Sequence, residues 1–391
     1  MADITLLATA DWDHPLWTNK QHVACQLAER GHRVLYVESI GLRPPRPGAA
    51  DRSRLIRRLR HGLQGPRRVR PNLWVWSPLV LPAASSPWGL RLNRLVLRLG
   101  LAACRGLLRL RRDWLWTYNP LTLQLFDTSR HGLLIYHCVD AIQEQPGMPA
   151  RTIDLWEERL SRAADAVFVT SPQLLERHRR FNPACRFYGN VADADHFGRA
   201  LEASLPEPPE LAVLPRPRLG FIGAISGYKL DLPLLAALAR QQPEWTLVLI
   251  GPVGEGDPET DVSELKGLAN VVFAGPQPYR ALPAWLKGMD VALLPVRRNA
   301  YTRAMFPMKF FEYLAAGVPV VATAIETLAP HADVARLSPP DPASFAAAIR
   351  RCLDGDVPPL DRRLAVAGAH TYRTRTGAML ADVARLTGTA A

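Results

Sequence analysis

The chain has 391 residues, of which 48% are hydrophobic, enough to fill the cores of two domains of ordinary size. It contains no apolar run of the ~18 residues that a transmembrane helix needs, and its N-terminus lacks the basic start and long apolar stretch of a signal peptide. Its five cysteines are scattered, odd in number and never spaced C-x-x-C, which favours a reducing cytoplasm and argues against a zinc site.

The positive charge of the chain is concentrated in one segment. Residues 43–112 contain 17 arginines and one acidic residue, Asp51, so this segment carries +16, while the whole chain carries +12 and the remainder therefore −4. A nucleic-acid-binding role is one interpretation of such an excess, but the segment has no helix-turn-helix, zinc-finger or RNP-like aromatic pattern. We therefore expect no nucleic-acid partner.

Short apolar strands and amphipathic helices alternate through the first half of the chain. Residues 21–30, which Gly31 ends, and residues 155–164 are predicted helices. Such alternation is typical of a parallel sheet that helices cover on both faces. The predicted strands are residues 4–8, 33–37, 73–76, 114–118, 133–137 and 166–170.

A long amphipathic helix is predicted over residues 87–112, inside the basic segment. Arginines recur on it every seven residues, and leucines fill much of its remaining surface. Such a helix can lie on an anionic membrane surface, but it can also pack its leucines inward and leave its arginines in water. A further arginine cluster over residues 52–70 favours the membrane interpretation for the whole segment. The arginines assigned to this contact are Arg91, Arg94, Arg98, Arg105, Arg109 and Arg112.

The second half of the chain repeats the alternation. A proline- and acid-rich stretch, residues 205–217, predicts a linker between two α/β domains, residues 1–204 and 218–373. Ligands of open α/β sheets bind at the carboxyl ends of the strands, so we expect a site in a cleft there. The predicted strands are residues 219–223, 246–251, 271–274, 291–295 and 318–323, and the predicted helices are residues 230–241, 279–286, 309–316, 343–353 and 374–386.

The most informative stretch is residues 307–323, PMKFFEYLAAGVPVVAT. It predicts a helix that ends at Gly317, followed by a short buried strand. Lys309 and Glu312 are three residues apart, so they lie on one face of this helix. The first turn of a helix together with a lysine can bind a phosphate, and a carboxylate one turn later can accept hydrogen bonds from two sugar hydroxyls.

This stretch resembles the nucleotide-sugar signature of the group 1 glycosyltransferases, which are retaining enzymes of the GT-B fold. It is closer to the branch that reads P-x-K-x-x-E-Y-x-A-x-G-x-P-V-V, associated with bacterial polysaccharide assembly. Glu312 matches the second glutamate of the family's E-x7-E pattern, which binds the donor ribose, and Ala304 replaces the first. The resemblance implies two Rossmann-like parallel-sheet domains facing a central cleft, with residues 374–391 forming a helix that returns to the first domain.

The resemblance continues in the loop after the first strand of the second domain. Gly223 and Lys229 match the family's G-R-L-x-x-x-K-G loop, whose cations neutralise the donor diphosphate, and Ala224 replaces the arginine. The chain has only five lysines against 43 arginines, so lysine at both family phosphate positions is informative. Turn chemistry is an equal interpretation of Asn299 and Thr302. By resemblance the donor-binding residues are Gly223, Lys229, Pro276, Tyr279, Asn299, Thr302, Pro307, Lys309 and Glu312.

The first domain is expected to hold the acceptor. Residues 133–137 lead into Cys138-Val139-Asp140, and this run resembles the branch's Y-D-C-x-D, which makes His137 and Asp140 candidates for orienting the acceptor hydroxyl. A core histidine and a helix cap are the alternative interpretations of these two residues. The loop after the first strand carries aromatic and polar side chains suited to stacking on a sugar. These candidate acceptor-binding residues are Asp11, Trp12, His14 and Trp17.

Together these features predict a cytoplasmic glycosyltransferase, peripheral at the inner face of the plasma membrane, that acts in cell-surface polysaccharide assembly. It would move a sugar from a nucleoside-diphosphate donor to a glycan or lipid-linked acceptor. The resemblance implies retention of anomeric configuration and neither a metal nor a cofactor. The catalytic set would be Lys229 and Lys309 on the departing diphosphate and Glu312 on the ribose, with His137 and Asp140 at the acceptor. A GT-B sugar-nucleotide epimerase and a catalytically silent partner subunit remain open as alternatives.

Overall fold

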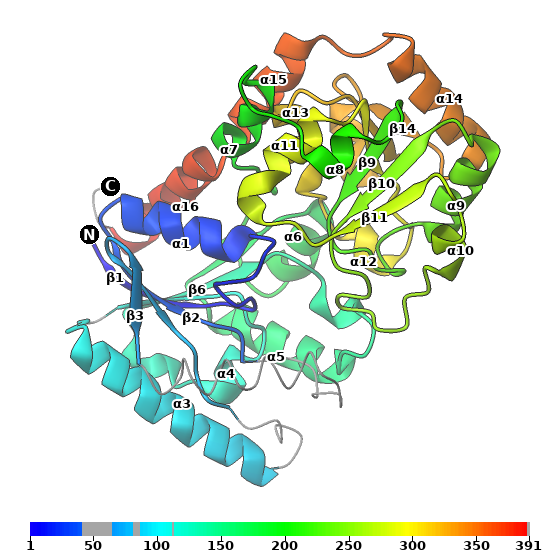
Figure 1. Ribbon diagram of the computed structural model, residues 1–391. Coiled ribbons are helices and arrows are strands. Elements are labelled where there is room, and N and C mark those ends of the chain that lie inside the picture. The colour runs from blue at the N-terminus through cyan, green and yellow to red at the C-terminus, as the bar shows by residue number, and fades with distance from the viewer. Residues whose placement is uncertain (41–64, 81–86, 112, 389–391) are drawn as a thin grey trace. The chain divides into compact units, whose positions relative to one another are not determined.

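The computed structural model describes residues 1–40, 65–80, 87–111 and 113–388. The chain divides into two compact α/β units, each with one sheet (Figure 1). The first unit contains the chain up to Gln143, then Gly147–Tyr188, and returns with Thr376 and the residues after it. The second unit contains Glu144–Pro146 and Gly189–Arg375.

The first unit is built on an eight-stranded sheet with the order β3-β4-β2-β1-β5-β6-β7-β8. Neighbouring strands are parallel except β3, which runs antiparallel to β4 at one edge. Central strands such as β6 are buried along their whole length, as a parallel sheet covered on both faces requires. The strands are β1 (Asp3–Leu7), β2 (Arg33–Val37), β3 (Arg67–Arg70), β4 (Leu73–Trp76), β5 (Trp114–Thr117), β6 (Leu133–Cys138), β7 (Ala166–Val169) and β8 (Cys185–Phe187).

Helices cover this sheet, and the last helix of the chain is one of them. α16, red in Figure 1, places Met379 and Val383 in the same core cluster as Val23 of α1 and Ile4 of β1. These four side chains are fully buried, so the C-terminal helix completes the core of the first unit. The helices are α1 (Asn19–Glu29), α3 (Pro87–Leu107), α4 (Thr122–Leu125), α5 (Ala150–Ala163), α6 (Pro172–Arg179) and α16 (Tyr372–Thr387).

The second unit has a six-stranded, all-parallel sheet with the order β11-β10-β9-β12-β13-β14. The strands are β9 (Arg218–Ile222), β10 (Thr246–Ile250), β11 (Val271–Gly275), β12 (Val291–Leu294), β13 (Val320–Thr323) and β14 (Arg336–Ser338). The helices are α7 (Ala194–Gly198), α8 (Pro209–Ala212), α9 (Leu232–Gln241), α10 (Ser263–Lys266), α11 (Leu282–Lys287), α12 (Ala300–Arg303), α13 (Lys309–Ala315), α14 (Pro342–Leu353) and α15 (Leu360–Ala369).

In each sheet the strand order reverses at the first strand of that unit. β1 lies between β2 and β5, and β9 lies between β10 and β12. In open α/β sheets, ligands bind beside the carboxyl ends of the strands at such a point. The loops that follow β1 and β9 are therefore where a ligand site is expected in each unit taken by itself.

The strands predicted from the sequence are all present, with ends that differ by no more than two residues. Three strands were missed: β3, β8 and β14. Each is a sheet edge of three or four residues that includes arginine. An edge strand is paired on one side only and lacks the continuous apolar run by which buried strands are recognised.

The boundary expected at residue 204 lies earlier, between Tyr188 and Gly189. The following residues belong to the second unit because they pack on it: the side-chain amide of Asn190 donates to the carbonyl of Phe306 at 2.7 Å, and α7 packs against α13. The expected linker, residues 205–217, is also part of this unit. Leu211 is fully buried, and Glu207 forms a 2.7 Å ion pair with Arg218.

The predicted amphipathic helix ends at Leu107, five residues earlier than expected, and the chain turns through Arg109, whose φ is +50°. The regular arginine stripe is interrupted as well. Arg105 lies 2.7 Å from the fully buried carboxylate of Asp113, so it faces the protein. No helix in the described ranges is long and apolar enough to cross a bilayer. Several of the arginines predicted to contact a membrane lie outside the described residues. They are Arg112 and, from the cluster over residues 52–70, Arg52, Arg54, Arg57, Arg58 and Arg60.

Candidate functional site

Three glycines stand at the ends of three adjacent strands of the second unit, from the strand where the order reverses to the edge of the sheet. Gly223, Gly251 and Gly275 stand at the ends of β9, β10 and β11, with φ values of +153°, +142° and +67°. A Cβ on Gly251 would lie 1.9 Å from the carbonyl oxygen of Gly223, so this close approach of two backbone segments admits no side chain. At this carboxyl edge of the sheet, backbone therefore packs directly on backbone, and Gly223 and Gly251 are both buried.

Lys229 lies in the loop that follows β9, and two segments hold that loop. Its backbone N–H donates to Ser226, and its carbonyl accepts from Arg297 at 2.9 Å. Its ammonium lies 5.1 Å from the ring centre of Tyr228 and 5.6 Å from that of Tyr301, within the range of a cation–π contact. The lysine predicted to contact the donor diphosphate is therefore held beside the switch point of the sheet.

Helix α13 carries the other two principal residues of the predicted site. The ammonium of Lys309 lies 2.7 Å from a carboxylate oxygen of Glu312, and both side chains are largely buried, at 15% and 5% exposure. Tyr313 anchors the helix to the end of β9, since its hydroxyl accepts the Ile222 N–H at 2.8 Å. Ile222 directly precedes Gly223, so α13 is fixed next to the first of the three glycines. We call Gly223, Gly251 and Gly275 the glycine edge.

The phosphate-binding first turn that the sequence suggested for α13 is not open in the structure. The helix has seven residues, and its first N–H groups bond within the chain. Phe310 donates to Pro307, and Phe311 and Glu312 both donate to Met308. These N–H groups are already satisfied, so the Lys309 side chain is the group of this motif that remains suited to bind a phosphate.

A segment that sequence reasoning did not assign to the site contacts the same helix. His196 of α7 stacks on Tyr279, with ring centres 4.2 Å apart, and its Nε2–H donates to the Tyr279 carbonyl at 3.0 Å. Burial lowers the pKa of His196, although the charges of Asp193 and Glu312 act in the opposite direction. Burial, followed by the charge of Glu312, raises the pKa of Tyr279 far above its ordinary value. Glu312 is therefore electrostatically coupled to Tyr279 and His196.

Two predicted donor residues serve as a helix cap. Asn299 and Thr302 form a capping box at the start of α12, in which the Thr302 N–H donates to Asn299 at 2.9 Å. The Asn299 amide also donates to the Tyr228 carbonyl at 2.7 Å, which ties α12 to the Lys229 loop. Their observed contacts are thus those of turn chemistry, the alternative that the sequence left open. Pro276 is exposed beyond β11, and Pro307 is buried before α13.

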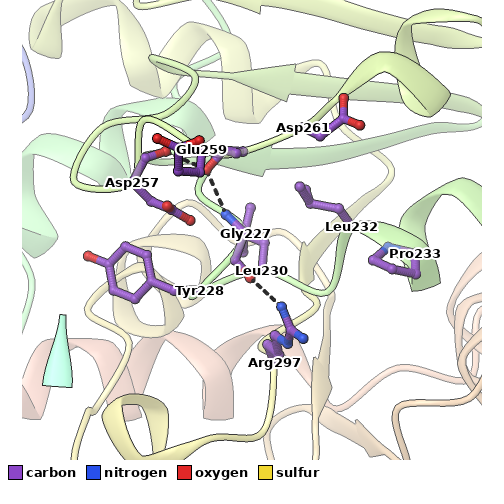
Figure 2. Close-up of a pocket in the computed structure, with 10 residues that line it drawn as sticks. Gly227, Tyr228, Leu230, Leu232, Pro233, Asp257, Glu259, Asp261 and Arg297 are labelled. Atoms are coloured by element: carbon purple, nitrogen blue, oxygen red, sulfur yellow. Dashed lines mark hydrogen bonds between the residues drawn. The ribbon is translucent and has the colours of Figure 1, made fainter. Parts of the chain in front are cut away.

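A pocket of about 330 Å³ adjoins the Lys229 loop (Figure 2). Its lining includes the acidic side chains of Asp257, Glu259 and Asp261, together with Arg297, which donates to the Gly227 carbonyl at 3.1 Å. Carboxylates accept hydrogen bonds from hydroxyl groups and repel phosphate, so this lining suits a polyol better than an anion. The acidic loop carried no recognised motif and was missed from the sequence.

In the first unit, the loop after β1 brings together the predicted aromatic residues. Trp12 is buried, with its ring centre 5.2 Å from those of Trp17 and Tyr36. Trp17 and His14 are partly exposed, and the Asp11 carbonyl accepts from Gln21 of α1 at 3.0 Å. Trp12 therefore shapes the loop, while Trp17, His14 and Asp11 are partly exposed and keep their place as candidates.

The two candidate residues at the end of β6 differ in their surroundings. His137 is fully buried, and its ring lies 4.7 Å from that of Tyr118 and 6.0 Å from that of Trp116. These surroundings are those of a core histidine, the alternative interpretation that the sequence left open for His137. Asp140 is partly exposed just beyond the carboxyl end of β6 and keeps its place as a candidate.

A buried polar cluster lies beneath this end of the first sheet. Three side chains here each offer an atom that could bind a metal, and these atoms lie within 4.8 Å of one another. The residues are Cys138, Glu157 and His178. Arg177 contacts Glu157 at 2.9 Å, and the Tyr136 hydroxyl donates to Glu157 at 2.6 Å. Burial raises the pKa values of Glu157 and Cys138 and lowers the pKa of His178 to about 3. The guanidinium already neutralises the carboxylate and would repel a cation, so we interpret the cluster as structural.

Comparison with known proteins bears on both units. Residues 216–355 match the family model described as "Glycosyl transferases group 1". Over 106 residues the chain is 41% identical to the "Putative teichuronic acid biosynthesis glycosyltransferase TuaH" of Bacillus subtilis (strain 168). This match covers 27% of the chain and 26% of that relative, so the chain aligns with only about a quarter of the relative's length.

Solved structures resemble the chain over nearly its full length. Sucrose-phosphate synthase from Thermosynechococcus elongatus has a TM-score of 0.69 at 19% identity, covering 99% of this chain and 100% of that one. Alr3699/HepE from Anabaena, solved in complex with UDP-glucose, has a TM-score of 0.63 at 14% identity, covering 97% and 100%. The chain therefore has the GT-B fold, and the family that its second unit matches over residues 216–355 is that of the group 1 glycosyl transferases.

Proposed function

We propose that the protein is a glycosyltransferase that moves a sugar from a nucleoside-diphosphate donor to a glycan or lipid-linked acceptor. The observation that carries this proposal is the grouping of the glycine edge, Lys229 and the Lys309–Glu312 pair around the end of β9. A departing diphosphate needs close backbone approach and fixed cations, because negative charge develops on it as the sugar leaves. The match of residues 216–355 to the group 1 family supports the same reaction.

Each residue of this group has a distinct proposed role. Lys229 and Lys309 neutralise the diphosphate, and Glu312 accepts hydrogen bonds from the ribose. The acidic pocket beside Tyr228 receives the donor sugar, whose hydroxyls suit its carboxylates. The base lies along Pro276 to Tyr279, beyond the end of β11. Transfer proceeds with retention and needs no metal or other cofactor, as the family resemblance implies.

Uridine is the nucleoside that we propose for the donor. Alr3699/HepE, which shares the fold over 97% of this chain, was solved with UDP-glucose. The name of the Bacillus subtilis relative refers to teichuronic acid biosynthesis, which supports a polymer of the cell surface as the product. Neither comparison favours the epimerase or the silent-subunit alternative.

The acceptor is proposed to bind at the loop after β1. A sugar can stack on the partly exposed ring of Trp17, while His14 and Asp11 offer polar contacts at the same loop. Asp140 is the remaining candidate for orienting the acceptor hydroxyl. A lipid-linked acceptor would keep the enzyme at the cytoplasmic face of the membrane, where the exposed Arg91, Arg94 and Arg98 of α3 can contact anionic lipid headgroups.

The test is donor use by the purified protein. Binding and release of the nucleoside diphosphate are measured with a panel of UDP-, GDP- and dTDP-sugars, with and without membrane lipid extract as the acceptor source. We expect release from a UDP-sugar and at least a tenfold loss in Glu312→Ala, because a charge-assisted hydrogen bond contributes about 1.5–3 kcal/mol. Glu264→Ala is the control, since Glu264 is an exposed glutamate of the same unit, paired with Arg240. A protein that binds none of these nucleotides would contradict the proposal.

A further inference from the structure

Helix α3 has an exposed apolar face directly opposite the face that packs on the first unit. On the inner face Asn93, Leu97, Leu101 and Cys104 are buried, and a Cβ on Gly100 would lie 2.4 Å from the Trp76 ring of β4. The outer face carries Trp88, Leu92, Leu95 and Leu99, spaced four, three and four residues apart and 78%, 45%, 51% and 60% exposed. This spacing places the four side chains in one row, which we call the apolar ridge.

The apolar ridge is unusual for the surface of this protein. The described residues include thirteen exposed large hydrophobic side chains, and the ridge with Leu107 contributes five of them from a single helix. The others are dispersed over several elements of both units. Isolated exposed leucines are normal in soluble proteins, whereas a contiguous apolar row indicates a surface that is covered in use.

The charges that flank the ridge indicate what covers it. Arg91, Arg94 and Arg98 are exposed along one side of the ridge, and the guanidinium of Arg91 lies 5.5 Å from the Trp88 ring. Helix α3 contains no acidic residue over its whole length. A row of leucines with tryptophan, bordered by arginines alone, matches a bilayer whose acyl chains lie beneath anionic headgroups.

We propose that α3 docks the first unit on an anionic phospholipid bilayer by inserting the apolar ridge into the boundary between headgroups and acyl chains. Arg91, Arg94 and Arg98 then lie at the level of the headgroup phosphates, with their aliphatic stems against the acyl region. The proposal rests on the membrane contact included in the proposed function but assigns it a different driving force. Insertion of the ridge supplies a salt-resistant hydrophobic contribution, while the arginines supply lipid selectivity that salt weakens.

The test is co-sedimentation of the full chain with vesicles of phosphatidylcholine alone or mixed with phosphatidylglycerol, at low and high salt. The triple leucine variant carries Leu92→Gln, Leu95→Gln and Leu99→Gln. We expect it to lower the vesicle partition coefficient at least about tenfold under every condition. Arg91→Gln/Arg94→Gln/Arg98→Gln should instead remove the preference for phosphatidylglycerol and leave the salt-resistant part. Leu155→Gln is the control, because Leu155 is 48% exposed on α5 of the same unit.

Quenching by vesicles with brominated acyl chains gives a second readout of insertion. The quenched fraction of tryptophan fluorescence should fall when Trp88 is replaced by Phe, since the ridge places this indole at the acyl boundary. Equal quenching of the native and Trp88→Phe proteins would overturn the insertion geometry. Vesicle binding of the triple leucine variant at the native level would overturn the role of the ridge.

Two further outcomes separate this proposal from its rivals. If light scattering shows a dimer that the triple leucine variant converts to a monomer, and neither protein binds vesicles, a second copy covers the ridge and the proposal is wrong. UDP release without vesicles should be unchanged in the leucine variant, because the ridge takes no part in donor binding. Failure of glycosyl transfer would leave the vesicle result intact, and failure of vesicle binding would leave UDP release intact, so the two proposals fail independently.

Discussion

Glu312 and Lys309 form an ion pair in which the carboxylate is almost completely buried. Removing one partner of such a pair leaves the other charge desolvated, so neither side chain can be altered alone without affecting its partner. Lys229 differs, because its ammonium lies against two aromatic rings and it belongs to a loop. The two lysines assigned to the donor diphosphate should therefore respond differently to substitution.

Calorimetry with UDP and UMP should separate these responses. Lys229→Ala is expected to weaken UDP binding by about tenfold and to leave UMP binding little changed, because the lysine contacts the diphosphate. Lys309→Ala should weaken UDP binding more strongly and also reduce UMP binding, since it leaves Glu312 without its ion-pair partner. Lys266→Ala, at an exposed lysine of α10 in the same unit, should alter neither affinity. Equal losses for the two nucleotides in both variants would show that the lysines act only on structure.

The site was predictable where its residues occupy a motif of fixed spacing. Lys309 and Glu312 are three residues apart on a helix, so their ion pair follows from the sequence once the helix is identified. His137 shows the opposite case, since the sequence places it at the end of a strand but gives no information on the rings that enclose it. His196 was missed because its stacking partner, Tyr279, lies more than 80 residues away along the chain.

At the scale of elements, the position of α13 depends on one side chain. The Tyr313 hydroxyl accepts the Ile222 N–H at 2.8 Å and donates to the Ile222 carbonyl at 3.3 Å, which joins the helix to the last residue of β9. Since Tyr313 is fully buried, no water can replace these bonds if the hydroxyl is removed. The geometry of the donor site therefore depends on a group that does not contact the donor.

Tyr313→Phe should destabilise the second unit by about 1–3 kcal/mol, because it leaves a buried N–H without a partner. It should also weaken UDP binding, since α13 would no longer be held to β9. Tyr36→Phe provides the comparison: Tyr36 is equally buried in the first unit, and its hydroxyl donates to the Ala10 carbonyl at 2.9 Å. That variant should lose stability and keep its affinity for UDP. Native UDP affinity in a folded Tyr313→Phe protein would contradict the positioning role.

A second test at this scale concerns the buried cluster of β6, α5 and α6. Burial lowers the pKa of His178 from 6.5 to about 3, so between these values the unfolded chain binds a proton that the folded protein does not. Stability should therefore fall as the pH falls below 6.5. Burial also raises the pKa of Glu157, and this shift increases stability as the pH falls. A variant that changes His178 alone keeps Glu157, so its comparison with the native protein isolates the effect of His178.

His178→Gln removes the titrating group and keeps an amide beside the Ser161 hydroxyl, which lies 2.8 Å from His178 Nδ1. The free energy of unfolding of the variant, relative to that of the native protein, should rise by about 2 kcal/mol as the pH falls from 7 to 5. Urea unfolding followed by tryptophan fluorescence measures this change, because eight of the ten tryptophans belong to the first unit. A constant difference between the two proteins across this pH range would show that His178 titrates normally.

The element pattern was predictable where strands are buried on both faces and uncertain at the edges. β7 and β12 are continuous apolar runs, Ala-Val-Phe-Val and Val-Ala-Leu-Leu, whereas the edge strand β3 reads Arg-Arg-Val-Arg and was overlooked. The proline-rich stretch at residues 205–217 was taken as a linker on composition. Its composition gives no information on the contacts that hold it to the second unit. Arg218 donates hydrogen bonds to Glu207 and to the carbonyls of Ala212 and Leu214. Such contacts arise only in the tertiary structure.

On the scale of the whole molecule, the chain begins and ends in the same unit. The first unit is complete only when α16 adds Met379 and Val383 to the cluster that contains Ile4, Val23 and Trp116. The hydroxyl of Tyr188, the last residue before the second unit, bonds to Asp382 of the same helix. Folding of the first unit thus requires residues that follow the whole of the second unit in the chain, whereas the second unit, apart from Glu144–Pro146, is one continuous segment.

This arrangement predicts a selective effect of core substitutions in α16. Met379→Ala and Val383→Ala each remove a fully buried side chain from the first unit, and a cavity of this kind costs about 2–5 kcal/mol for methionine and less for valine. Calorimetry should show the transition of the first unit moving to lower temperature, while the transition of the second unit and its affinity for UDP stay the same. Leu386→Ala is the matched control, because Leu386 is 49% exposed on the same helix and should have little effect. A single transition that shifts as a whole in the Met379 variant would show that the two units unfold together, and that the C-terminal helix stabilises the entire molecule.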